Sequence, residues 1–114
     1  MAPTFDPTVL VDQVIAERKL EENTITWTRG RLRFSPGMAG DGSFIDDTVA
    51  GLKPDERRVL DDMAATIDEP RLHAGYRALH VNPDVTSEAR LAAYRPAVVL
   101  GLLIADRLGV NVPV

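Results

Sequence analysis

The most constraining feature of this chain is a stretch near its C-terminus that contains no polar side chain. Residues 97–105 read Ala-Val-Val-Leu-Gly-Leu-Leu-Ile-Ala. A helix that is apolar on every side must be surrounded by protein or lipid, and nine residues are far fewer than the roughly 18–20 that span a bilayer. The sequence therefore predicts an apolar helix over 96–108 that lies either at the centre of a core or in a subunit interface.

The boundaries of this helix are marked by hydroxyl side chains, a proline and a glycine. Thr86 or Ser87 is expected to cap the start of the helical region. Pro96 then either kinks one long helix or starts a second one, because it has no N–H to continue the hydrogen-bond ladder. Gly109 is expected to end the helix, and the apolar tail over 109–114 follows it.

Helical spacing also appears in the rest of the chain. Asp6 followed by Pro7 is typical of a helix start, and Asn23 is the expected stop of this first helix. Shorter helices are predicted over 44–50, 54–67 and 70–80. The buried stripe of the first helix is expected to be Leu10, Val11, Val14 and Ile15.

Residues 24–34 change from helical spacing to alternation and predict a β-hairpin. Arg29-Gly30 separates two alternating runs. A turn with an even number of residues pairs Trp27 with Leu32 and Ile25 with Phe34, which places these four apolar side chains on one face. The type of turn stays open, because arginine is not ideal at the first position of a primed turn.

These elements indicate a mainly α (α+β) fold, a small helical bundle of four to five helices with one β-hairpin. The 114 residues are enough for a single domain with a modest core. A flexible loop is predicted over 35–43, where three glycines and a proline disfavour regular structure.

Composition and charge exclude several classes of function. The formal net charge is -4, which is unlike a bulk nucleic-acid binder. The chain contains no cysteine, so thiolate metal sites and a cysteine nucleophile are excluded. The N-terminus carries no signal-peptide pattern. We therefore expect a protein of the cytoplasm, or of a particle assembled inside a cell, with no membrane contact, no metal and no cofactor.

Arg29, Arg31 and Arg33 form the densest basic cluster in the sequence. An arginine-bearing β-ribbon can contact DNA, and it also suits an acidic protein surface, including that of a neighbouring copy. Arginine on a strand that simply faces water is the least specific interpretation. The acidic net charge favours a protein partner over nucleic acid.

Two further polar groups are weaker candidates. His73, Arg77 and His80 would share one face of the predicted 70–80 helix and could serve acid–base chemistry. The two histidines lie about two turns, or roughly 10 Å, apart, which is poor spacing for a shared metal. A polar helix face is the simpler interpretation. Arg57 and Asp61 are expected to pair along their own helix.

The apolar C-terminus, the predicted loop and the arginine cluster together favour assembly with other subunits. We predict a non-enzymatic structural or assembly subunit, of the connector or adaptor type, in a homo-oligomeric or multi-protein particle such as a virion. The alternatives are a small DNA-binding regulator that uses the arginine hairpin, and a small enzyme or accessory subunit that uses His73, Arg77 and His80. The residues expected to contact a partner are Arg29, Arg31, Arg33, Val98, Leu102, Val110, Val112 and Val114.

Overall fold

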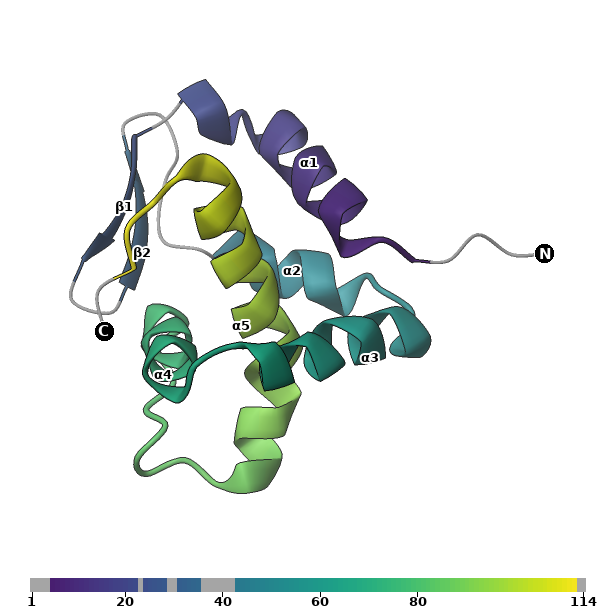
Figure 1. Cartoon of the computed structure of the whole chain (residues 1–114), viewed down its shortest axis with the longest axis vertical. Helices are drawn as coiled ribbons and strands as arrows, with labels where there is room; N and C mark the ends of the chain where they lie inside the picture. Colours follow the sequence, from purple (N-terminus) through teal and green to yellow (C-terminus); the bar gives the residue numbers. More distant parts are fainter. Residues whose placement is uncertain (1–4, 23, 29–30, 36–42, 113–114) are drawn as a thin grey trace.

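A computed structural model of the chain describes residues 5–22, 24–28, 31–35 and 43–112. It is mainly α, as the sequence predicts. In chain order the elements are α1 (Pro7–Arg18), the 3-10 turn η1 (Leu20–Glu22), β1 (Thr24–Thr28), β2 (Arg31–Ser35), α2 (Ser43–Ala50), α3 (Pro54–Met63), the 3-10 turn η2 (Ala64–Thr66), α4 (Glu69–Ala78) and α5 (Glu88–Leu108) (Figure 1).

Helix α5 is the centre of the fold. It continues through Pro96 as one helix, which settles the alternative between one kinked helix and two. Helices α1, α2, α3 and α4 all contact it, and every residue from 96 to 105 is buried except the half-buried Leu103. Of the two locations predicted for the apolar run, the core of its own chain is therefore the correct one.

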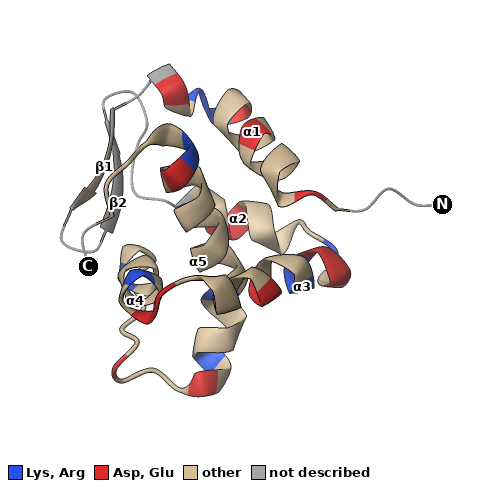
Figure 2. Ribbon diagram, viewed as in Figure 1, with Lys and Arg blue, Asp and Glu red and all other residues tan. Residues whose placement is uncertain are grey.

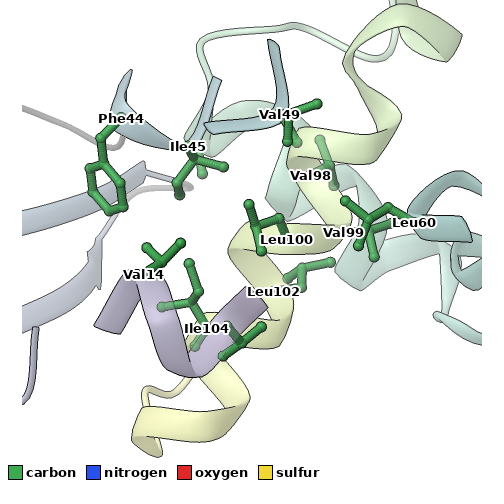
Figure 3. Packing of buried hydrophobic residues seen from close by; sticks show 14 of the residues in the cluster. Val14, Phe44, Ile45, Val49, Leu60, Val98, Val99, Leu100, Leu102 and Ile104 are labelled. Atoms are coloured by element: carbon green, nitrogen blue, oxygen red, sulfur yellow. The ribbon is translucent and has the colours of Figure 1, made fainter. Parts of the chain in front are cut away.

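The surrounding helices each direct apolar side chains toward α5. Val14 of α1, Ile45 of α2 and Leu60 of α3 belong to one buried cluster with the C-terminal half of α5. Figure 3 shows Leu60 beside Val99 and Ile45 turned toward Leu100. This convergence removes apolar surface from water at roughly 25 cal/mol per Å², and it is the main force that holds α5 at the centre.

The first helix begins as predicted and ends earlier than predicted. Asp6 accepts a hydrogen bond from the Thr8 N–H at 2.9 Å, and Pro7 is the first helical residue. The prediction that α1 continues to Asn23 is wrong, because the helix ends at Arg18 and Lys19 takes a left-handed conformation with φ 53°. That conformation usually selects glycine or asparagine, so a lysine there gives no sequence signal.

The last helix ends where the sequence predicts. Gly109 has φ 71°, a left-handed conformation that glycine adopts without a Cβ clash. Its N–H donates to the Asp106 carbonyl at 3.2 Å, and the Val110 N–H donates to the Ala105 carbonyl at 2.8 Å. These bonds satisfy carbonyls that the helix leaves free at its end.

Strands β1 and β2 pair antiparallel in the register that side-chain parity predicts. Ile25 lies opposite Phe34, and Trp27 lies opposite Leu32. The predicted turn at 29–30 and most of the predicted loop, 36–42, fall outside the described residues. Trp27 is buried against the core, which ties β1 to the helices.

Charged residues of both signs are interspersed along the described helices (Figure 2). Helix α5 forms an ion pair with each of three neighbouring helices. These pairs are at or near the surface, where each contributes about 0–1 kcal/mol, so they orient the helices more than they stabilise them. The pairs are Arg107–Asp12 with α1, Arg95–Asp61 with α3 and Asp106–Arg71 with α4.

Candidate protein interface

The structure places two of the predicted contact residues inside the core. Val98 and Leu102 are each 1% exposed. Both lie on the buried part of α5, where α4 packs against them near Gly75. These side chains stabilise the chain itself and are not accessible to a partner in this conformation, so the candidate interface does not include them.

The predicted tail is placed only in part. Val110 and Val112 are partly buried against the chain's own core, so they contribute to the fold. Val114 lies outside the described residues. The part of the tail that the structure describes, residues 109–112, therefore supports folding back onto the chain rather than extension into solvent.

For the arginine cluster, the structure gives the backbone positions of two of its three residues. Arg31 and Arg33 belong to β2, opposite Thr28 and Thr26. Residues two apart on a strand share a face, so positions 31 and 33 lie on the same face of the sheet. Arg29 lies outside the described residues.

The histidine candidates do not share one helix face. Helix α4 ends at Ala78, and His80 lies beyond it in a left-handed conformation with φ 62°. His73 remains on the helix, with its Nε2 atom 3.6 Å from Glu69 Oε1. Because the helix stops before His80, this residue does not lie on one helix face with His73 and Arg77, as the proposed site for acid–base chemistry requires.

A polar cluster that the sequence analysis missed joins α3, α4 and α5. The buried Tyr76 hydroxyl donates to the Leu91 carbonyl at 2.9 Å, and Arg95 Nη1 lies 3.3 Å from Asp61 Oδ1. Asp61 therefore pairs across to α5 instead of along its own helix with Arg57. Burial raises the pKa of Tyr76, and the neighbouring Arg95 opposes this rise. The cluster fixes the positions of the three helices relative to one another.

The best candidate for a contact surface is an open groove of about 250 Å³ beside the start of α1. Val9 is its most informative residue, because it is 52% exposed although it is large and apolar. At 100° per residue, Val9 lies on the side of α1 opposite the buried stripe. The lining residues, which we call the α1 groove, are Phe5, Asp6, Val9, Leu10, Gln13, Leu52 and Glu56.

Two helix starts shape the α1 groove. Asp6 caps α1 through the Thr8 N–H, and Glu56 accepts a hydrogen bond from the Lys53 N–H at 2.9 Å at the start of α3. These bonds hold both carboxylates in place in a lining that also contains the apolar Phe5, Val9, Leu10 and Leu52. Such a surface can bury an apolar side chain and orient a cation beside it.

A second groove, of about 230 Å³, lies at the other end of α1, but ion-paired side chains line it. Arg107 lies 3.2 Å from Asp12 and 3.8 Å from Glu21. Its charged groups already satisfy one another within the chain. This groove is therefore a weaker candidate than the α1 groove, whose lining includes four apolar side chains.

Within the described residues, no helix is long and apolar enough to cross a membrane. The same residues contain no group of three histidine or acidic side chains placed to hold a metal ion. No protein family, curated protein or solved structure matches the chain.

Proposed function

We propose that this chain is a structural or assembly subunit, of the connector or adaptor type, in a homo-oligomeric or multi-protein particle. It would act in the cytoplasm or within a particle assembled there. The observation that supports this proposal is the α1 groove, where the half-exposed Val9 lies beside the partly buried Phe5, Leu10 and Leu52. Helix α1 thus carries the apolar Val9 on its solvent side in addition to the apolar side chains on its core side, and a second protein surface would cover Val9.

The strength expected of this contact is modest. Burying the exposed half of one valine contributes about 1 kcal/mol, and the small groove belongs to the class of weak or transient interfaces. Weak contacts suit assembly, because many copies in one particle reinforce one another through high effective concentration. Arg31 and Arg33 would add orientation by facing acidic groups of a neighbouring subunit.

The proposal is tested by placing a charge in the groove. We expect Val9→Asp to weaken self-association by roughly tenfold or more, since a carboxylate would be buried against apolar side chains. Sedimentation equilibrium over a range of protein concentrations measures the effect. Ala65→Asp, at an exposed position of η2 outside the groove, is the matched control and should associate like the wild type. Equal association of both variants would contradict a role for the groove.

A further inference from the structure

We draw no further inference here: the strongest candidate, the surface patch at the turn between α4 and α5 where the exposed Val85 lies near the acidic Asp84 and Glu88, is a single apolar side chain, and nothing in the structure shows what covers it.

Discussion

Gly75 sets how closely two helices of this fold can approach. A Cβ atom at this position would lie 2.5 Å from Val98 Cγ1, which is too close for a real contact. Gly101 on α5 is different, because a Cβ there would meet Ile45 Cδ1 at an ordinary 3.5 Å. One glycine is therefore required by packing between α4 and α5, and the other is not.

We expect Gly75→Ala to lower the free energy of unfolding by about 1–3 kcal/mol, since the added methyl group forces α4 and α5 apart. Gly101→Ala is the matched control. It should leave the free energy of unfolding unchanged or raise it by about 0.5–1 kcal/mol, because alanine is the better helix former. Urea denaturation measures both. Equal destabilisation by the two variants would contradict the close approach at Gly75.

Tyr76 gives the fold a dependence on alkaline pH. Burial raises its pKa above the ordinary value of 10.0, so the folded state holds this proton more tightly than the unfolded state does. The resulting stability is fully present below pH 10 and is lost as the pH rises from there through the folded pKa.

Tyr76→Phe should cost about 1 kcal/mol at neutral pH through loss of the bond to the Leu91 carbonyl. It should also remove part of the decline in stability above pH 10. Denaturation curves between pH 8 and 11 measure both effects, with Tyr94→Phe as the control. An unchanged decline in Tyr76→Phe would show that another group causes it.

At the scale of elements, the sequence predicts what local chemistry determines. Pro7 and Gly109 mark helix boundaries by their own conformational limits, and the apolar run of α5 has to be buried. The ends of α1 and α4 were not predictable in this way. Lys19 and His80 adopt left-handed conformations that their residue types do not favour, so residue type alone does not mark these helix ends.

The candidate site was less accessible to sequence reasoning than the fold. The α1 groove joins residues 5–13 to Leu52 and Glu56, and only the packing of α1 beside the start of α3 brings them together. Val9 did give a signal, as an apolar residue on the polar side of its helix. Val98 and Leu102 were predicted as contacts because the apolar run of their helix is equally compatible with a core and with an interface.

The ion pair between α3 and α5 should contribute more than the pair between α1 and α5. Arg95 and Asp61 have side chains that are 24% and 37% exposed, whereas those of Arg107 and Asp12 are 51% and 54% exposed. In double-mutant cycles with alanine, we expect a coupling energy of about 0.5–1 kcal/mol for Arg95–Asp61 and less than about 0.5 kcal/mol for Arg107–Asp12. A larger coupling energy for Arg107–Asp12 than for Arg95–Asp61 would mean that burial does not control the strength of these ion pairs.

For the whole molecule, the central question is whether folding leaves apolar side chains exposed that a second protein could cover. The apolar core is buried by the chain's own helices, since α1 to α4 cover the apolar run of α5. The α1 groove, with the half-exposed Val9, remains open to solvent. Stability therefore depends on α5, whereas the proposed assembly contact uses the α1 groove.

The most direct test of this account is the mass of the wild-type chain by light scattering, measured over rising concentration at low and high salt. The account predicts a mass that rises above that of the monomer with concentration and persists at high salt, because salt screens ion pairs but does not weaken an apolar contact. A monomer mass at every concentration and at both salt levels would contradict it.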